Sequence, residues 1–158
     1  MAKDTKDLAA SRSLPRRRIL VADDDPVVRQ ALSRLLAMNS ALEVCGEAVD
    51  GQDAVIKAEK HRPDLVILDL SMQILNGLEA ATEISRIVPE VRIILFSAYG
   101  QRLQDIDIKA YGVTRVVSKD DNVLGHVADL LNTAGTDIPA RSSALSKKRK
   151  RPKNRLGK

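Results

Sequence analysis

The chain has 158 residues, of which 44% are hydrophobic, with one cysteine and a formal net charge of +5. These values predict one domain with tails, large enough to bury a core, and they exclude a disulfide framework. Because no apolar run reaches the roughly 18 residues that a membrane span needs, we expect a cytoplasmic protein without a membrane segment. The single cysteine, Cys45, is interpreted as a small core side chain.

The charge is distributed unevenly along the chain. Residues 1–140 carry a net charge of −4, whereas residues 141–158 carry +9 and no acidic side chain. The basic character therefore belongs to the end of the chain, and it argues only weakly for a nucleic-acid-binding fold.

The first regular pattern follows a leader, residues 1–16, that is expected to be disordered. An apolar run at residues 19–22 predicts a strand, and Asp25 followed by Pro26 predicts the start of a helix. A second strand alternates around Leu42 and Val44, which is typical of a sheet edge.

A helix is predicted from the turn at Asp50 to just before Pro63. The apolar run at residues 65–68 predicts a central strand covered on both faces. The remaining elements are a helix with its buried stripe at residues 80–88, a strand at 91–96, a weaker helix at 103–110, a strand at 114–118, and a helix through Val123, Val127, Leu130 and Leu131.

Alternation of five strands with five helices predicts an α/β fold with a doubly wound, five-stranded parallel sheet. Right-handed crossovers favour the strand order 2-1-3-4-5, with the alternating second strand at an edge. The predicted domain covers residues 17–134. Residues 135–158 lack apolar periodicity and are expected to form a disordered basic tail.

Polar side chains stand where four of the predicted strands end. They are Asp23, Asp24, Asp69, Ser97 and Lys119. An acidic residue after a strand is most often a helix cap, but Asp25 already fills that role and Asp69 has no helix directly after it.

Parallel strands bring these side chains to one edge of the sheet. Carboxylates a few ångströms apart repel by roughly 4 kcal/mol at an effective dielectric near 20, so a cation such as Mg²⁺ is expected among them. A hydroxyl at Ser97 and an ammonium at Lys119 suit a phosphoryl group held on Asp69, which would be the nucleophile.

Five blocks in order, at residues 19–26, 47–51, 63–77, 96–98 and 119–120, carry a resemblance to a known family. Over residues 17–134 the chain resembles the receiver domain of two-component response regulators, which has a flavodoxin-like fold. It is most similar to the receivers that precede a DNA-binding helix-turn-helix.

The resemblance implies a role for each site residue. Asp69 would accept a phosphoryl group from a phosphohistidine on a sensor histidine kinase or phosphotransfer protein. Asp24, Asp69 and the Ser71 carbonyl would bind Mg²⁺ directly, and Asp23 would bind it through water. Ser97 and Lys119 would hold the phosphoryl oxygens, and the inward pull on Ser97 would shift a surface near the fourth helix and fifth strand.

Two positions depart from the family pattern. Val116 stands where a switching tyrosine or phenylalanine is usual, so the readout of phosphorylation is expected to differ. Gln73 stands where a proline is usual, and it is expected to loosen the loop after Asp69.

Three functions are compatible with these residues. The leading one is a stand-alone receiver, not an enzyme beyond its own phosphorylation and dephosphorylation, that signals through a protein partner or as a homodimer. The alternative is a pseudo-receiver whose basic residues 147–155 bind nucleic acid in a salt-dependent way, although such a run serves equally as a solvated tail. An aspartate-nucleophile phosphatase is disfavoured because Ser71 stands where the second aspartate would act.

Overall fold

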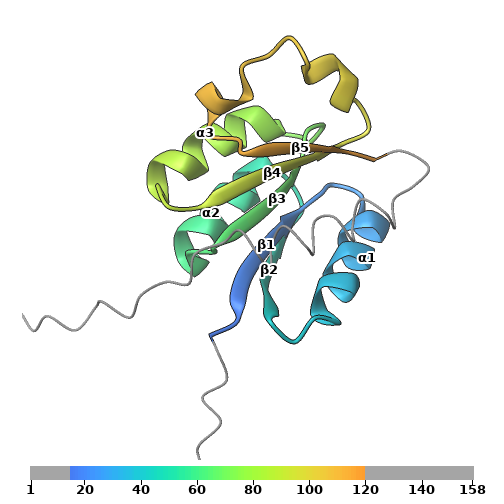
Figure 1. Cartoon of the computed structure of the whole chain (residues 1–158), viewed down its shortest axis with the longest axis vertical. Coiled ribbons are helices and arrows are strands. Elements are labelled where there is room, and N and C mark those ends of the chain that lie inside the picture. The colour runs from blue at the N-terminus through green and yellow to red at the C-terminus, as the bar shows by residue number, and fades with distance from the viewer. Residues whose placement is uncertain (1–14, 120–158) are drawn as a thin grey trace, which may run out of the picture.

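Strands and helices alternate through residues 15–119, the part of the chain that the computed structural model describes (Figure 1). The strands are β1 (Arg17–Ala22), β2 (Leu42–Ala48), β3 (Leu65–Asp69), β4 (Arg92–Ser97) and β5 (Arg115–Ser118). The helices are α1 (Pro26–Ala37), α2 (Gly51–His61) and α3 (Gly77–Ile87), with two single-turn 3-10 helices at Gly100–Leu103 and Ile108–Tyr111.

The five strands form one parallel sheet in the order β2-β1-β3-β4-β5, which confirms the predicted fold. The alternating strand β2 lies at an edge, as its pattern indicates. All five residues of β3 are buried at the centre of the sheet. A strand that is apolar on both sides needs cover on both faces, and β3 has it.

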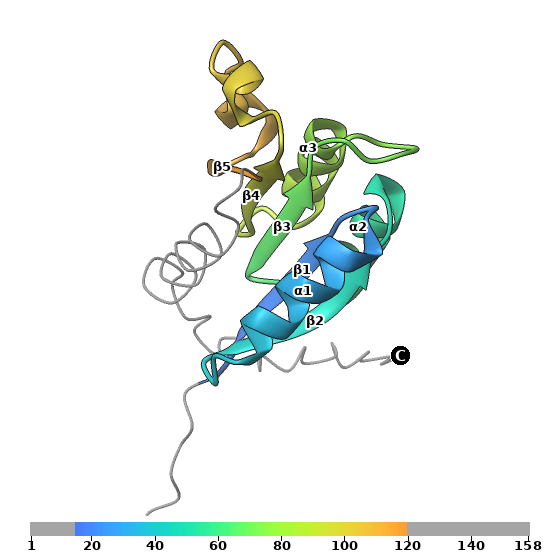
Figure 2. The ribbon, with the colours of Figure 1, turned by 90° about the vertical axis from the view of Figure 1, so that its right-hand side faces the viewer.

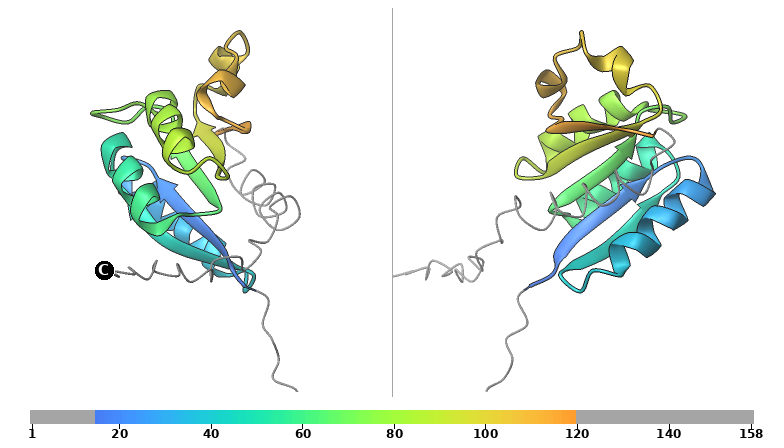
Figure 3. Two further views of the ribbon diagram at one scale, coloured as in Figure 1. Left: turned by 90° about the vertical axis from the view of Figure 1, so that its left-hand side faces the viewer. Right: turned by 45° about the vertical axis from the view of Figure 1, so that its right-hand side comes forward.

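Helices lie on both sides of the sheet (Figures 2 and 3), and an apolar core lies on each of its two faces. Helices α2 and α3 cover one face, where Leu20 and Leu68 meet Ala54 and Ile84. Helix α1 lies on the opposite face and packs Leu32 and Leu36 on the sheet residues that alternate with the first set. The period-two alternation of each strand therefore divides its side chains between the two cores.

Each α-helix begins at a side chain that accepts a hydrogen bond from a free N–H of the first turn. Asp25 caps α1 through Val27 N at 2.8 Å, and Pro26 follows it, as predicted. Asp50 caps α2 through Asp53 N, and Asn76 forms a capping box with Glu79 at α3. These caps fix where the chain turns back after β1, after β2 and before α3.

The prediction of one helix over residues 103–110 is wrong. Two separate 3-10 turns occupy this stretch. Leu103 is the one residue between positions 100 and 112 that is buried, so no apolar stripe holds a longer helix on the sheet. Asp107 accepts a hydrogen bond from Lys109 N and Gly112 takes a left-handed conformation, and together they confine the second turn.

Several predicted segments lie outside the described residues. They are most of the leader, the helix through Val123, Val127, Leu130 and Leu131, the tail, and the candidate nucleic-acid contact at residues 147–155. Over residues 15–119, no helix combines the length and the apolar character needed to cross a membrane.

Candidate functional site: a carboxylate cluster at the end of the sheet

Four strands end in the polar side chains that the sequence singles out. Asp23 follows β1, Asp69 closes β3, Ser97 closes β4 and Lys119 follows β5. Since all the strands run in the same direction, these residues meet at the carboxyl edge of the sheet. The connections between strands run in one direction from β1 and in the opposite direction from β3, so the strand order changes direction between these two strands. Open α/β sheets bind their ligands at such a point.

Three carboxylates converge at this edge. One oxygen each from Asp23, Asp24 and Asp69 lies within 4.8 Å of the other two. The residues Asp23 and Asp69 are 1% and 6% exposed, whereas Asp24 is exposed to solvent. Burial raises the pKa of Asp23, and its bonds to Lys119 and the Asp25 N–H oppose that rise.

Lys119 neutralises part of this charge. Its ammonium forms an ion pair with the Asp23 carboxylate and lies 3.0 Å from Oδ1 of Asp69. It also stands 5.4 Å from the centre of the Phe96 ring. Burial alone would lower the pKa of Lys119, but the bonds to the two carboxylates outweigh burial and raise it, so the ammonium is a fixed positive charge.

Ser97 is fully buried at the end of β4. Its hydroxyl oxygen accepts a hydrogen bond from Tyr99 N at 3.0 Å, and its carbonyl accepts one from Lys119 N at 2.8 Å. An oxygen that accepts in this way keeps its own O–H to donate. Ser97 therefore offers a donor at the same edge as the carboxylates.

Ser71 is exposed in the loop between β3 and α3. That loop is closed by a hydrogen bond from Gly77 N to Leu70 O at 2.9 Å, and Ile74 within it has a φ of 69°. The role of the Ser71 carbonyl as a metal ligand stays a prediction. So does the expected loosening at Gln73.

The set of oxygen donors fits a hard divalent cation. Mg²⁺ binds one or two carboxylates with water and phosphate oxygens, and three carboxylate oxygens within 4.8 Å supply such ligands. The exposed side chain of Asp24 keeps one side of the cluster open to solvent.

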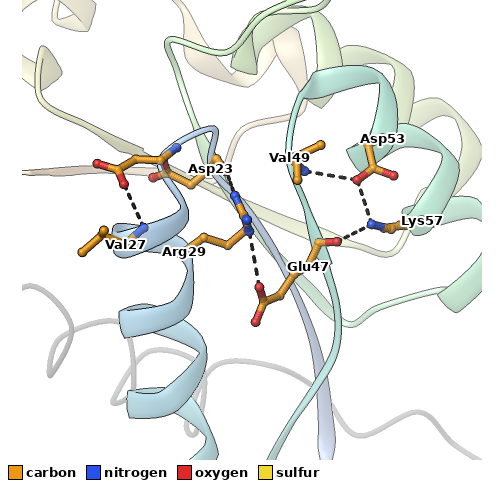
Figure 4. A network of polar contacts seen from close by, with 8 residues as sticks. Asp23, Val27, Arg29, Glu47, Val49, Asp53 and Lys57 are labelled. Carbon is orange, nitrogen blue, oxygen red and sulfur yellow. Dashed lines mark hydrogen bonds and ion pairs between the residues drawn. The ribbon is translucent and has the colours of Figure 1, made fainter.

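Two residues near the cluster, Arg29 and Glu47, are not among the site residues that the sequence predicts. Arg29 of α1 donates through Nη1 to the main-chain oxygen of Asp23 at 2.7 Å, and through Nε to Oε2 of Glu47 at 3.3 Å (Figure 4). Nothing in the local pattern marks Arg29, because it resembles any polar residue on an amphipathic helix. Its partner on β2 is 18 positions away.

Val116 is half-buried and packs against the core that α2 and α3 cover. A hydrocarbon side chain in this position supplies packing and no hydrogen-bonding group. The tyrosine near it in sequence, Tyr111, belongs to the second 3-10 turn.

Comparisons with known proteins agree with this geometry. The sequence profile of the response regulator receiver domain matches residues 19–127. The response regulator protein VraR of Staphylococcus aureus is 31% identical over 108 residues, which make up 65% of this chain and 52% of VraR. The chain thus spans about half the length of the curated relatives it matches.

Two solved structures from Thermotoga maritima are similar over most of their length. The response regulator domain of CheB has a TM-score of 0.70 and 26% identity, covering 78% of this chain and 96% of that one. Response regulator TrrA, solved in complex with Mg²⁺-BeF, has a TM-score of 0.62 and 32% identity, covering 73% and 98%. The profile match spans more than half of the sequence and the strand order agrees with it, so the chain belongs to the family of response regulator receiver domains.

Proposed function

We propose that this receiver domain accepts a phosphoryl group on Asp69 from a phosphohistidine of a sensor histidine kinase or phosphotransfer protein. The observation that carries the proposal is the position of Asp69. Its carboxylate shares one sheet edge with two further carboxylates, and the Lys119 ammonium lies 3.0 Å from its Oδ1. Family membership supports the same chemistry.

Asp69 is the nucleophile. A carboxylate oxygen of Asp69 forms a bond to phosphorus as the phosphorus–nitrogen bond of the phosphohistidine breaks, with the electron pair of that bond staying on the imidazole. The backbone of β3 holds Asp69 in place through its pairing with β4, so the acceptor oxygen is oriented before the donor arrives.

Asp23, Asp24, Asp69 and the Ser71 carbonyl would hold Mg²⁺, with Asp23 acting through water. When bound, the ion supplies positive charge that offsets the negative charge developing on the phosphoryl oxygens. The Lys119 ammonium and the Ser97 hydroxyl would contact the same oxygens from the side of β4 and β5. Groups fixed in this way stabilise the transferring phosphoryl without reorganising.

Loss of the phosphoryl group would occur by attack of water on phosphorus, which releases inorganic phosphate and restores the Asp69 carboxylate. This self-dephosphorylation and the acceptance step are the only chemistry we propose for the domain. The signal would leave through a protein partner whose docking depends on the phosphorylated state.

The test is the intact mass of the full chain after incubation with phosphoramidate, first with Mg²⁺ and then with EDTA. Samples are kept near neutral pH because acyl phosphates are labile. We expect one phosphoryl adduct that depends on Mg²⁺ in the unaltered protein and in Asp105→Asn, which removes one carboxylate from an exposed position. Asp69→Asn should form none.

An adduct of equal yield in Asp69→Asn would refute Asp69 as the acceptor. Absence of any adduct in the unaltered protein, under all conditions, would refute phosphoryl acceptance itself. Steady turnover of phosphate esters without a stable adduct would instead favour a phosphatase.

A further inference from the structure

A chain of polar contacts runs from the carboxylate cluster across α1, β2 and α2 (Figure 4). It starts at the main-chain oxygen of Asp23, passes through the guanidinium of Arg29 to Glu47, and continues from the Glu47 carbonyl to the ammonium of Lys57. Lys57 in turn pairs with Asp53 at 2.7 Å. This network links the acidic end of β1 to α1, β2 and α2.

We propose that Arg29 is a positioning residue for the cation site: it fixes the main chain at Asp23 so that the Asp24 carboxylate meets those of Asp23 and Asp69. The inference rests on the proposed Mg²⁺-dependent function and names a residue that the function does not itself require to touch the ion. The Arg29 side chain is 12% exposed, so its contacts form largely out of solvent.

The main chain of Asp23 is held at both of its polar groups. Its N–H donates to Ala48 O at 3.2 Å, and its carbonyl accepts from Arg29 Nη1 at 2.7 Å. Its side-chain Oδ1 accepts from Asp25 N at 2.9 Å. Asp24 lies between these anchored neighbours with its own side chain exposed, so the direction of its carboxylate depends on how firmly they hold the backbone.

Arg29 joins the anchoring because of its place on α1. Its own N–H donates to Asp25 O at 3.0 Å within the first helical turn, while its guanidinium reaches back to Asp23. One residue therefore ties the start of the helix to the end of the strand. Removal of this tie leaves the Asp23 carbonyl without its side-chain donor.

Glu47 explains how a cation is tolerated close to a site for a second cation. Its Oε2 lies 3.3 Å from Arg29 Nε and offsets the guanidinium charge. The guanidinium therefore contributes directed hydrogen bonds with little net positive charge. Mutation of a residue that hydrogen-bonds to a metal ligand and orients it typically lowers metal affinity by about 10–100-fold.

The direction in which Mg²⁺ affinity changes distinguishes a positioning role of Arg29 from a purely electrostatic one. Removing a positive charge near a carboxylate cluster should by itself strengthen binding of a cation. If Arg29 acts by positioning, Arg29→Ala should instead weaken it. A matched control is Arg34→Ala, which removes the same charge from an exposed position on the same helix.

The experiment measures the Kd for Mg²⁺ alone by isothermal titration calorimetry, without any phosphodonor. The proteins are the full chain, Arg29→Ala, Arg29→Lys and Arg34→Ala, each with its thermal midpoint recorded. A second readout is hydrogen–deuterium exchange at the main-chain N–H groups of residues 23–25 in the metal-free proteins, which reports the anchoring directly. Arg29→Lys keeps the charge and a single donor group, so it remains informative if Arg29→Ala folds poorly.

We expect the Kd for Mg²⁺ to rise about tenfold in Arg29→Ala and less in Arg29→Lys, with faster exchange at residues 23–25. Arg34→Ala should show neither change. An unchanged or lower Kd in Arg29→Ala would overturn the proposal. If the unaltered protein binds no Mg²⁺, the proposed function fails. The exchange rates then test separately whether Arg29 anchors the Asp23 main chain: faster exchange in Arg29→Ala supports this role, and equal exchange refutes it.

Discussion

The ammonium of Lys119 stands 3.0 Å from Oδ1 of Asp69, although β3, which ends at Asp69, and β5, which Lys119 follows, are not neighbours in the sheet. It also pairs with Asp23, so one side chain balances two buried carboxylates. A cation bound at the cluster would take over part of this balancing charge.

Lys119→Met should therefore lower the free energy of unfolding of the metal-free protein, on the order of 3 kcal/mol, because two buried carboxylates lose their partner. Mg²⁺ should restore more stability to this variant than to the unaltered protein, since the ion replaces the missing charge. A tenfold lower Kd corresponds to about 1.4 kcal/mol of added stabilisation at saturating Mg²⁺. Thermal midpoints with and without Mg²⁺ measure this, and equal shifts in the two proteins would contradict it.

Gly77 closes the loop that follows Asp69, and it has no room for a side chain. A Cβ at this position would lie 2.4 Å from Asp69 O and 2.9 Å from Leu70 Cα. Gly77→Ala should therefore reduce the free energy of unfolding by about 2 kcal/mol, since backbone must move to admit the methyl group. Gly100→Ala is the matched control, because its Cβ would meet nothing nearer than 3.7 Å.

Urea unfolding of the two glycine variants gives the comparison. The interpretation fails if the two substitutions have the same effect. A large loss in both would point to a general intolerance of alanine in these loops and not to the contact with Asp69.

Asp53 should make the stability depend on pH. Partial burial alone would raise the pKa of Asp53, but hydrogen bonds from Lys57 Nζ at 2.7 Å and Val49 N at 3.1 Å outweigh burial and lower it below 3.8. A folded-state pKa below the unfolded value adds stability above the unfolded pKa, and this is lost as the pH falls through the folded pKa.

Asp53→Asn is therefore expected to cost about 1 kcal/mol at pH 7. The difference from the unaltered protein should shrink as the pH falls below about 4, where the aspartate itself becomes protonated. Urea unfolding at pH 7 and at a series of acidic values checks this, with Asp105→Asn as the control for loss of one negative charge. A difference that is constant across the series would show that the Asp53 charge is not responsible.

Cys45 should react slowly with thiol reagents in the folded protein. It is half-buried on β2, its S–H donates to Ile19 O at 3.3 Å, and burial raises the pKa of the thiol. The thiolate is the reactive form, so both effects lower the rate. The rate of reaction with a disulfide reagent at pH 8 is measured before and after unfolding in guanidinium. We expect this rate to increase greatly on unfolding, and equal rates would contradict the half-buried position of Cys45.

The sequence predicts the sheet well because the relevant signals are local. A continuously apolar strand needs cover on both faces, which places β3 at the centre, and the alternating pattern of β2 suits an edge. Asp25 and Asp50 identify helix starts because a cap acts on its own neighbours. Because the strands are parallel, Asp69 at the end of β3 and Lys119 after β5 then lie at the same edge of the sheet.

The same reasoning fails where a contact joins distant segments. The apolar residues of positions 103–110 are compatible with a helix, but only packing against the sheet decides that Leu103 alone is buried there and that two 3-10 turns form. Sequence also gives no sign that a Cβ at Gly51 would come within 2.1 Å of the Leu75 carbonyl. These outcomes depend on distances between elements, which no local pattern encodes.

By itself the sequence determined which side chains reach the carboxyl edge of the sheet, because the end of each apolar run and the shared direction of the strands decide which residues lie there. The tertiary structure alone decided how those side chains are held. Lys119 bridges Asp23 and Asp69, and Arg29 ties the Asp23 main chain to Glu47 across two elements. Hydrogen bonds and ion pairs act only over a few ångströms, so they exist only once packing has brought their partners together.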